Sequence, residues 1–317
     1  MVKPRRKYER GVALLATLLA IALMTILVME FTTSSALGYR EAATQANELR
    51  ASYLARSAIQ VGCAMLEASA LAQVGQPTVY DGLDQPWAQP IPPVHVDGGT
   101  VSLLIVDEAR KLDINQLFDP RTRRINEDFA QVLARLFASV GVSTDLLPIL
   151  VDWDDPDSVV SPSGAEADYY LGLMPPYEPR NGPMPTIYDL RAVKGMNDST
   201  FRLLSNFLTA APEPRVNANT ASAQVLASLS PELSNSPELV ESIIAARSDQ
   251  PFVAVTDIAN LPGIGTFANH ITPMLTTRSS YFTLIGEGQF AGARKRIYAM
   301  FRRNLNGTMM LMSWHED

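Results

Sequence analysis

Residues 11–29 read Gly-Val-Ala-Leu-Leu-Ala-Thr-Leu-Leu-Ala-Ile-Ala-Leu-Met-Thr-Ile-Leu-Val-Met, and the rest of the chain is arranged around this stretch. It carries no charge and no proline, so at about 1.5 Å per residue it spans roughly 28 Å of hydrocarbon as a helix. The basic residues that precede it are Lys3, Arg5, Arg6, Lys7 and Arg10. Because a basic flank stays in the cytoplasm, we expect one membrane-spanning helix, with the chain after Glu30 exported.

A cleaved signal peptide has the same two ingredients, a basic start and an apolar run. This run is longer than the roughly 7–15 residues of a typical signal core, and no turn follows it. Apolar residues instead continue at a spacing of three or four as far as Leu66, without an intervening proline. We therefore predict that the membrane helix continues as an amphipathic helix to about residue 70. A stretch rich in proline and glycine, from Gln73 to Gly99, ends it.

Composition is consistent with an exported, partly membrane-bound protein. Of the 317 residues, 47% are hydrophobic and 19% are charged, which favours packed globular structure over disorder. The net charge is -7 although the N-terminus is basic, so the exported part is more acidic still. This acidity argues against broad nucleic-acid binding. The lone Cys63 cannot form an internal disulfide and is most simply a small packing residue.

The junction Arg10-Gly11, directly before the apolar helix, resembles the cleavage site of type IV pilins and type II secretion pseudopilins. The resemblance implies that a prepilin peptidase cuts after Gly11, which makes Val12 the first mature residue and the site of N-terminal methylation. Most members have glutamate at the fifth mature position, which here is Ala16. This departure is similar to the K-type minor pseudopilins of type II secretion systems, which are also unusually large.

Ala16 has two interpretations. An alanine in a membrane helix needs no special explanation. The resemblance implies that in pilin-like fibres the glutamate at this position pairs with the N-terminal amine of the neighbouring subunit. This pair lies inside an apolar core, where an unpaired charge is costly. A subunit with Ala16 cannot neutralise a subunit above it in this way, so the departure is typical of a subunit at the tip.

Strand-like stretches lie on both sides of a long middle segment. One strand is expected at 100–107, and three more are expected at 281–290, 295–305 and 308–314. Asn306-Gly307 predicts a two-residue hairpin between the last two strands. A long helix beside a small antiparallel sheet is the pilin-like plan, so we predict an α+β fold interrupted by about 170 residues. The predicted domains are a prepilin leader (1–11), the transmembrane part of the helix (12–35), a pilin-like domain (36–111 and 279–317) and an inserted all-helical domain (112–278).

The inserted segment contains a diverged repeat. Ala-Gln-Val-Leu-Ala occurs at 130–134 and at 223–227, and residues 189–196 match 257–264 in their acidic, apolar and glycine positions. These two elements begin 59 residues apart in the first copy and 34 apart in the second, so the first copy has about 25 extra residues. We interpret the segment as two modules similar to SAM or helix-hairpin-helix units, one of which carries an inserted acidic loop.

The second module ends in Leu-Pro-Gly-Ile-Gly at 261–265, after a predicted helix at 238–247. This turn resembles that of a helix-hairpin-helix, whose DNA-binding members hold a phosphate with backbone N–H groups. Only Arg278 lies nearby, His270 is neutral at pH 7, and no basic cluster follows. We therefore favour a tight turn between packed helices over DNA binding.

Six carboxylates crowd one short stretch. They are Asp152, Asp154, Asp155, Asp157, Glu166 and Asp168. Carboxylates at this density repel one another unless they are solvated, protonated or neutralised by a cation, and oxygen ligands without Cys or His favour calcium over zinc or copper. The spacing is not that of an EF-hand, because Asp157 takes the sixth loop position and Ser163 the twelfth. The residues alone leave a calcium site and a solvated acidic loop as equal alternatives.

The same stretch is similar to the calcium-binding segment of K-type pseudopilins. The similar residues are Asp-Trp-x-Asp-x-Asp at 152–157, Gly-Ala-Glu at 164–166 and the tyrosine pair at 169–170. The resemblance implies calcium as the cofactor. It implies as leading ligands Asp155, Asp157 and Glu166, with Asp152 next.

No catalytic signature accompanies these acids. The three histidines are scattered, and neither Gly-x-Ser-x-Gly nor His-Glu-x-x-His occurs. Paired acids can cleave a glycosidic bond, but these crowd one loop without a partner motif. We therefore expect a protein that is not an enzyme.

Taken with the resemblance, these features predict a minor pseudopilin at the tip of the periplasmic pseudopilus of a type II secretion system. We expect a single-pass protein of the bacterial inner membrane with its C-terminal domain in the periplasm. The resemblance implies as partners the I-, J- and H-type minor pseudopilins, the major pseudopilin and the prepilin peptidase, and we expect no nucleic acid. The rivals are a minor pilin of a type IV pilus, a membrane-anchored DNA-uptake protein that uses the 261–265 turn, and a membrane-anchored hydrolase.

Overall fold

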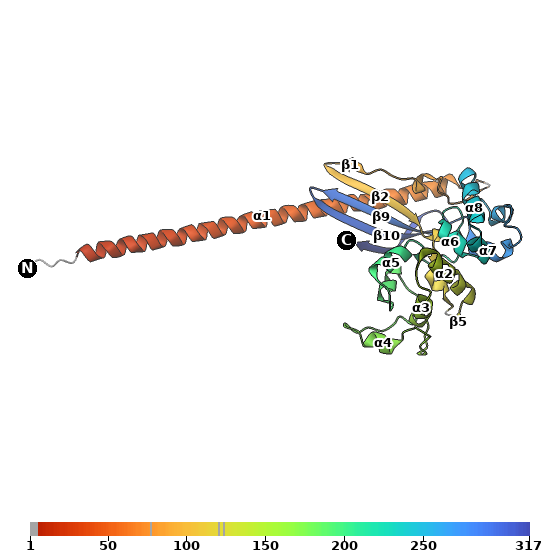
Figure 1. The fold of residues 1–317 in the computed structure, drawn as a ribbon. Helices are drawn as coiled ribbons and strands as arrows, with labels where there is room; N and C mark the ends of the chain where they lie inside the picture. Colours follow the sequence, from red (N-terminus) through yellow and green to blue (C-terminus); the bar gives the residue numbers. More distant parts are fainter. Residues whose placement is uncertain (1–5, 77, 120, 123) are drawn as a thin grey trace, which may run out of the picture.

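Helix α1 (Arg6–Ala72) dominates the computed structural model, which describes residues 6–76, 78–119, 121–122 and 124–317. The helix has 67 residues, about 100 Å, without a break. Its N-terminal part projects as a free rod, and its C-terminal part lies along the rest of the molecule (Figure 1). The predicted continuation of the membrane helix is therefore confirmed. Residues 1–5 of the predicted leader lie outside the described residues.

A five-stranded antiparallel sheet packs on α1, with the strand order β1-β2-β9-β10-β11. The strands are β1 (Val94–Val96), β2 (Gly99–Asp107), β9 (Tyr281–Phe290), β10 (Ala293–Arg303) and β11 (Met309–Glu316). The four predicted strands lie within two residues of these bounds, whereas the short, exposed β1 was not expected. β2 and β9 are hydrogen-bonded neighbours, so the segment between them is an insertion into the sheet.

The hairpin between β10 and β11 is longer than the two residues predicted from Asn306-Gly307. The Asn304 N–H donates to the Thr308 carbonyl (2.8 Å), which leaves three residues in the loop. Gly307 closes that loop at a φ of 86°, the left-handed conformation found in three-residue hairpins. The Asn306 side chain accepts a hydrogen bond from the Thr308 N–H (3.2 Å) and so stabilises this longer turn.

Small residues allow α1 to lie close to β9. A Cβ atom at Gly286 would be 2.5 Å from the Ala55 carbonyl oxygen, and one at Gly288 would be 2.1 Å from that of Ala51. Both alanines are fully buried, so helix and strand are in direct backbone contact. The apolar core that this contact creates comprises Ala55, Ala58, Ile59, Leu66, Trp87, Leu103, Ile105, Phe282, Leu284, Ile297, Ala299 and Phe301.

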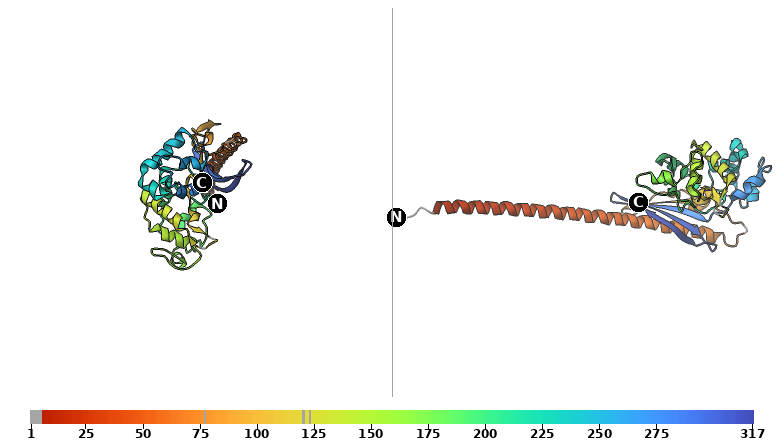
Figure 2. Two further views of the ribbon diagram at one scale, coloured as in Figure 1. Left: turned by 90° about the vertical axis from the view of Figure 1, so that its right-hand side faces the viewer. Right: turned by 90° about the horizontal axis from the view of Figure 1, so that it is seen from below.

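The segment between β2 and β9 has an apolar core of its own. Its longest helices are α2 (Glu127–Val140), α3 (Leu146–Asp154) and α8 (Pro237–Asp249). The shorter ones are η3 (Ile114–Gln116), α4 (Ala167–Leu171), η4 (Ile187–Ala192), α5 (Asp198–Leu204), α6 (Ala223–Ser228), α7 (Pro231–Asn235), α9 (Val255–Ala259), α10 (Ala268–Ile271) and η5 (Thr272–Met274). Two 3-10 turns, η1 (Pro86–Ala88) and η2 (Glu108–Arg110), precede the insert. Figure 2 shows α1 and the insert on opposite sides of the sheet.

The insert is mainly helical, but the expectation that it is all-helical was wrong. It also contains three ladders of two-residue strands: β3 (Leu112–Asp113) parallel to β6 (Leu208–Thr209), β7 (Val216–Asn217) parallel to β8 (Leu275–Thr276), and β4 (Phe118–Asp119) antiparallel to β5 (Arg124–Ile125). Strands of two residues are too short to show alternation in the sequence. The two parallel ladders enclose residues 112–209, the first half of the insert, and residues 216–276, the second half.

One asparagine in each half makes the same pair of hydrogen bonds. The Asn115 side chain accepts from the Met184 N–H (2.7 Å) and donates to the Met184 carbonyl (3.0 Å). The Asn219 side chain does the same with Phe252, at 2.8 Å for both bonds. Each side-chain amide therefore satisfies both the backbone N–H and the backbone C=O of a residue far away in the sequence, as a neighbouring strand would.

The correspondence continues along the chain from these pairs. Five residues after Met184 and Phe252 come Asp189 and Asp257, each of which accepts from the backbone N–H three residues before it, at 3.1 and 2.9 Å. Six residues further on, Gly195 and Gly263 both have a φ near 80° (77° and 82°). The sequence repeat is thus matched by shared contacts, while the likeness to SAM or helix-hairpin-helix units stays a prediction.

The glycine turn at 261–265 is explained by packing. Gly263 needs the left-handed conformation, and a Cβ atom there would lie 2.8 Å from a methyl group of Leu239 on α8. The next residue, Ile264, is fully buried in the core of the insert. These contacts require glycine at 263 without any phosphate ligand.

Candidate metal centre

Helix α3 carries the first acidic residues, and an aromatic cluster holds its end. Trp153 is buried, with its ring centroid 5.1 Å from that of Tyr170 and 6.3 Å from that of Tyr177. Its carbonyl accepts a hydrogen bond from the Asn181 N–H (2.9 Å). The last turn of α3 is thereby fixed, and Asp155 follows directly as its C-cap.

Asp152 shapes the loop that follows α3. Its carboxylate is fully buried and accepts from the Ser161 N–H with both oxygens, at 3.2 and 3.1 Å. The chain passes so close that a Cβ atom at Gly164 would lie 1.9 Å from one of these oxygens. The structure therefore gives Asp152, predicted as the next ligand, a position beneath the loop with its carboxylate already engaged by the backbone.

The three leading candidates lie together at the surface of this loop. Asp155, Asp157 and Glu166 each offer one carboxylate oxygen, and these oxygens are within 4.8 Å of one another. Asp155 and Glu166 are buried, whereas Asp157 is exposed. The Asp157 N–H donates to Asp155 (3.2 Å), and the Val159 N–H donates to Asp157 (2.7 Å), so short turns orient both aspartates.

Glu166 lacks a partner that its burial requires. Its Oε1 atom is buried and has no hydrogen-bond partner in the described part of the chain. The pKa of Glu166 is raised to about 7, mainly by burial and then by the negative charges of Asp155, Asp152 and Asp157. Burial also raises the pKa of Asp155. A cation would remove both costs, because it supplies the missing partner and neutralises the mutual repulsion.

These three residues fit calcium. Two oxygens bound to one calcium ion at about 2.3–2.6 Å can be at most about 5 Å apart, which accommodates the observed separations. Carboxylate oxygens are the ligands that calcium prefers, and the single cysteine, Cys63, lies on α1. Asp155, Asp157 and Glu166 would hold the ion, and water or backbone carbonyls would complete its coordination.

Asp154 and Asp168 do not join this group. Asp168 is exposed on α4. Asp154 is buried, and its Oδ1 has no hydrogen-bond partner among the residues that the structure describes. Burial, followed by the charge of Asp155, raises the pKa of Asp154 to about 7. Its charge also contributes to raising the pKa of Asp113, to about 7, although burial is the main cause there. No sequence pattern points to this second buried carboxyl pair, because Asp113 lies about 40 residues away.

The processing residues lie in the exposed part of α1. Gly11, Val12 and Ala16 are all helical, and apart from the neighbouring backbone of the helix itself none of the described residues comes within 4 Å of the place of a Cβ atom at Gly11. The stretch that begins at Gly11 reaches a mean hydropathy of 2.8 with no buried residue, and it is long enough to cross a membrane. These properties are those of a single membrane anchor.

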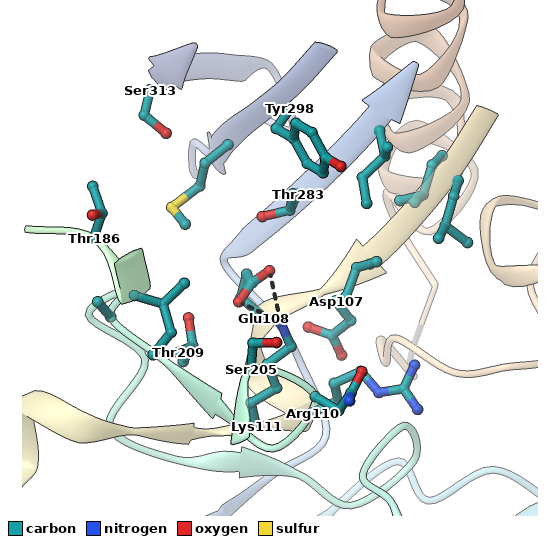
Figure 3. A pocket seen from close by; sticks show the side chains of 18 of the residues that line it. Asp107, Glu108, Arg110, Lys111, Thr186, Ser205, Thr209, Thr283, Tyr298 and Ser313 are labelled. Atoms are coloured by element: carbon teal, nitrogen blue, oxygen red, sulfur yellow. Dashed lines mark hydrogen bonds and ion pairs between the residues drawn. The ribbon is translucent and has the colours of Figure 1, made fainter. Parts of the chain in front are cut away.

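A groove of about 940 Å³ separates the sheet from the first half of the insert (Figure 3). Thr283 and Tyr298 belong to its sheet wall, the face opposite α1, and Thr186 belongs to the wall from the insert. At one end, Lys111 and Glu108 form an ion pair (3.2 Å). Most of the groove's lining is apolar, and charged side chains are concentrated where the sheet joins the insert.

Ser313 and His315 also line this groove, and they raise the question of a catalytic triad. His315 Nε2 lies 2.6 Å from Asp317 Oδ1, whereas in a catalytic triad the acid holds the other ring nitrogen, Nδ1, and Nε2 faces the serine. Among the described residues, no hydrogen bond joins Ser313 to His315. The arrangement is therefore not that of a hydrogen-bonded triad.

Comparisons with known proteins identify the family. Two family models described as type II secretion system (T2SS), protein K, match residues 110–213 and 216–278. Protein K of Klebsiella pneumoniae is 30% identical over 273 residues, which cover 79% of this chain and 82% of that protein. The chain belongs to the type II secretion system protein K family. Protein K of Pseudomonas aeruginosa is 29% identical over 318 residues, which cover 97% of this chain and 93% of that protein.

The crystal structure of the GspK-GspI-GspJ complex from enterotoxigenic Escherichia coli contains a chain with the same fold. That chain matches with a TM-score of 0.70 and 20% identity, and the match covers 90% of this chain and 99% of that one. The α+β, pilin-like fold is thus confirmed. As a member of the protein K family, the chain is a minor pseudopilin of type II secretion, a structural component, and neither a type IV pilin nor a DNA-uptake protein is favoured.

Proposed function

We propose that this minor pseudopilin lies at the tip of the periplasmic pseudopilus. The observation that carries the proposal is the position of the insert, at the end of α1 remote from the membrane segment (Figure 1). In a fibre built from parallel α1 helices, a further subunit above this one would meet the insert. Ala16 supports the same position, because it offers no carboxylate to the amine of a subunit above.

The proposed partners follow from the fold and the membrane helix. The similar crystal structure is that of a complex with GspI and GspJ, so we infer that the I- and J-type minor pseudopilins bind this chain. The H-type minor and the major pseudopilin would follow in the fibre. The prepilin peptidase would cut between Gly11 and Val12, and the basic N-terminal flank would keep the C-terminal domain in the periplasm.

The copy number per fibre tests the tip position. When fibres are separated by length, a tip subunit should become rarer relative to the major subunit as length increases. Quantitative mass spectrometry of sheared fibres measures this ratio, and the same sample reports the mature N-terminus, expected at Val12. A ratio that stays constant with fibre length would contradict the tip position, and a start near Ala36 would indicate ordinary signal-peptide cleavage.

We also propose that the acidic loop binds calcium and that the ion orders the first half of the insert. The support is the buried Oε1 of Glu166, which has no hydrogen-bond partner in the described part of the chain and lies beside the carboxylates of Asp155 and Asp157. An ion that binds only the folded loop stabilises the fold by about 2.7 kcal/mol at a hundredfold excess over Kd. Magnesium sheds water reluctantly and should stabilise less.

Thermal unfolding of the full chain in detergent micelles tests the calcium proposal. Calcium should raise the melting temperature of the parent, but not that of a triple variant with Asp155→Asn, Asp157→Asn and Glu166→Gln. A matched control removes three exposed acids from α8 and should respond like the parent; it carries Glu238→Gln, Glu241→Gln and Asp249→Asn. A triple variant that responds to calcium as the parent does would show that the loop is only a solvated acidic surface.

Finally, we infer that the chain does not catalyse a reaction. The support is the geometry of the groove, in which Ser313 has no base within hydrogen-bond distance among the described residues. Purified protein should therefore show no hydrolysis of esters, peptides or glycosides. An activity lost in a Ser313→Ala or acidic-loop variant would overturn this inference.

A further inference from the structure

Lys194 is a second charged residue, besides Asp152, that contacts the backbone of the acidic loop. Its ammonium donates to the carbonyls of Ser163 (3.2 Å) and Gly164 (2.8 Å), and lies 5.0 Å from the ring centroid of Tyr169. In the described part of the chain no carboxylate is within ion-pair distance of it. A lysine beside several acids therefore binds peptide carbonyls instead of the acids.

These contacts leave Gly164 next to two charged side chains. The Asp152 carboxylate accepts from the Ser161 N–H and leaves no room for a Cβ atom at 164. The Lys194 ammonium donates to the Gly164 carbonyl. Two residues further along is Glu166, whose buried Oε1 has no hydrogen-bond partner among the described residues and whose neighbours include Asp155 and Asp157. The orientation of Glu166 thus depends on how the chain is held at 163 and 164.

The second half of the insert lacks both the loop and the lysine. Asp189 corresponds to Asp257 and Gly195 to Gly263 in their contacts and conformation, so Lys194 corresponds to Pro262. A proline there has no side-chain donor. The lysine is therefore not required by the shared scaffold, and it occurs in the half that has a loop to hold.

We propose that Lys194 is a positioning residue of the metal centre, which holds Ser163 and Gly164 so that Glu166 faces the same ion as Asp155 and Asp157. This inference rests on the proposed calcium binding. Charge-assisted hydrogen bonds to two carbonyls fix the loop before the ion arrives, so less ordering is needed on binding. Because the carbonyls of Ser163 and Gly164 already accept hydrogen bonds from Lys194, we expect the ion to be bound here by carboxylates and not by these carbonyls.

The positive charge of Lys194 has two effects of opposite sign on calcium affinity. By Coulomb repulsion alone, the ammonium weakens cation binding, so its removal would tighten it. As a positioning residue, it strengthens binding, and loss of such an outer contact typically costs 10–100-fold in metal affinity. The direction of the change in Kd therefore separates the two roles.

Calorimetric titration of the full chain in detergent micelles with calcium chloride tests the proposal. Lys194→Met should raise Kd 10–100-fold, and Lys194→Arg, which can still donate to both carbonyls, should stay within about threefold of the parent. The matched control is Lys295→Met, which removes the same charge from a half-buried lysine on β10 and should leave Kd unchanged. Affinity that is equal to or tighter than the parent's in Lys194→Met would overturn the proposal.

A double-mutant cycle tests whether Lys194 acts through Glu166. In a Glu166→Gln background, Lys194→Met should change Kd by less than about threefold, because the group that it positions is gone. If the effects of Lys194→Met and Glu166→Gln on the free energy of calcium binding simply add, the positioning role is overturned. That conclusion holds even if Lys194→Met alone unfolds the loop in chelator. A parent that does not bind calcium would refute the proposed calcium function itself, which distinguishes that failure from the failure of this inference.

Discussion

The two halves of the insert have one scaffold, but among the described residues a metal-binding candidate occurs in the first half alone. In each half the first and last strands pair with each other in a parallel two-residue ladder, and one asparagine side chain pairs with the backbone of a distant residue. Between α2 and Met184 the first half has 43 residues, whereas 23 separate α6 from Phe252 in the second. The same contacts tolerate both lengths, so the acidic loop could be added without changing what holds the scaffold together.

One position in the shared ladder shows how the halves diverged. In the second half, Asn217 is buried and donates to Asp107 (3.2 Å), to the Asp81 carbonyl (3.0 Å) and to Ser279 (2.9 Å). It thereby ties the insert to the pilin-like domain. The corresponding residue in the first half is Asp113, a buried carboxyl whose pKa burial raises to about 7. At this position the second half therefore has a hydrogen-bonded joint to the pilin-like domain, whereas the first half has an ionisable group.

The largest expected effect comes from the two asparagines. Asn219→Ala leaves a buried N–H and a buried carbonyl of Phe252 unpaired, which should cost about 3–4 kcal/mol at roughly 1–3 kcal/mol per group. Asn115 is half-buried, so Asn115→Ala should cost about 2 kcal/mol. Urea unfolding of the full chain in micelles measures both, with Asn260→Ala as an exposed control near zero. If Asn219→Ala were as stable as the wild type, the asparagine pairs would not be what holds the shared scaffold of the two halves together.

Calcium should act on one half only. At a hundredfold excess over Kd, the ion should slow amide hydrogen exchange in residues 146–171 by up to about a hundredfold, which corresponds to about 2.7 kcal/mol. Residues 223–276 should exchange at the same rate with calcium and with chelator. Equal protection of both halves would mean that they unfold as one unit.

A smaller effect is expected from pH, through Asp113. Its pKa is about 7 in the folded chain, compared with 3.8 for an unperturbed aspartate, so the folded state holds the proton more tightly. The stability that this proton provides is present at acid pH and is lost as pH rises through about 7, by about 1–2 kcal/mol between pH 5.5 and 7.5. Asp113→Asn, which introduces the residue of the second half, should flatten the urea-midpoint profile measured in chelator over that range. A profile as steep as the parent's would assign the pH dependence to other carboxyls.

The smallest effect should come from the paired glycines. Gly195→Ala forces alanine into the left-handed conformation, which costs about 1 kcal/mol, and no described residue crowds the new methyl group. Gly263→Ala has the same cost and must also displace Leu239, so it should be less stable than Gly195→Ala by about 0.5–1 kcal/mol. The difference in urea midpoint measures this, and the reverse order would show that the two turns are not equivalent.

Several elements could be predicted because their signals are local. The apolar run and the helical spacing after it predict α1, whose end at Ala72 is two residues beyond the expected one. Runs of β-branched and aromatic residues predict β2, β9, β10 and β11 to within two residues. Each of these patterns is contained in a few consecutive turns or strand residues, so one chain is sufficient to show it.

Other elements depend on partners far away in the chain and left no such pattern. The two parallel ladders need a strand about 60 or 96 residues distant, and the asparagine pairs join residues 33 or 69 apart. Lys194 contacts a loop about 30 residues before it. In the sequence none of these residues stands out, because only the folded chain brings each one to its partner.

The order of residues is enough to show that six carboxylates lie close together in one loop. What each of them does depends on the folded chain, because burial and hydrogen bonding, which the residue type does not encode, set the state of a carboxyl group. Asp152 turns inward and binds the Ser161 N–H, Asp168 stays in solvent, and the buried oxygen of Glu166 is left without a partner among the described residues. The difference between a structural carboxylate and a candidate ligand therefore arises from how the loop folds, which decides whether a backbone N–H reaches a given carboxylate.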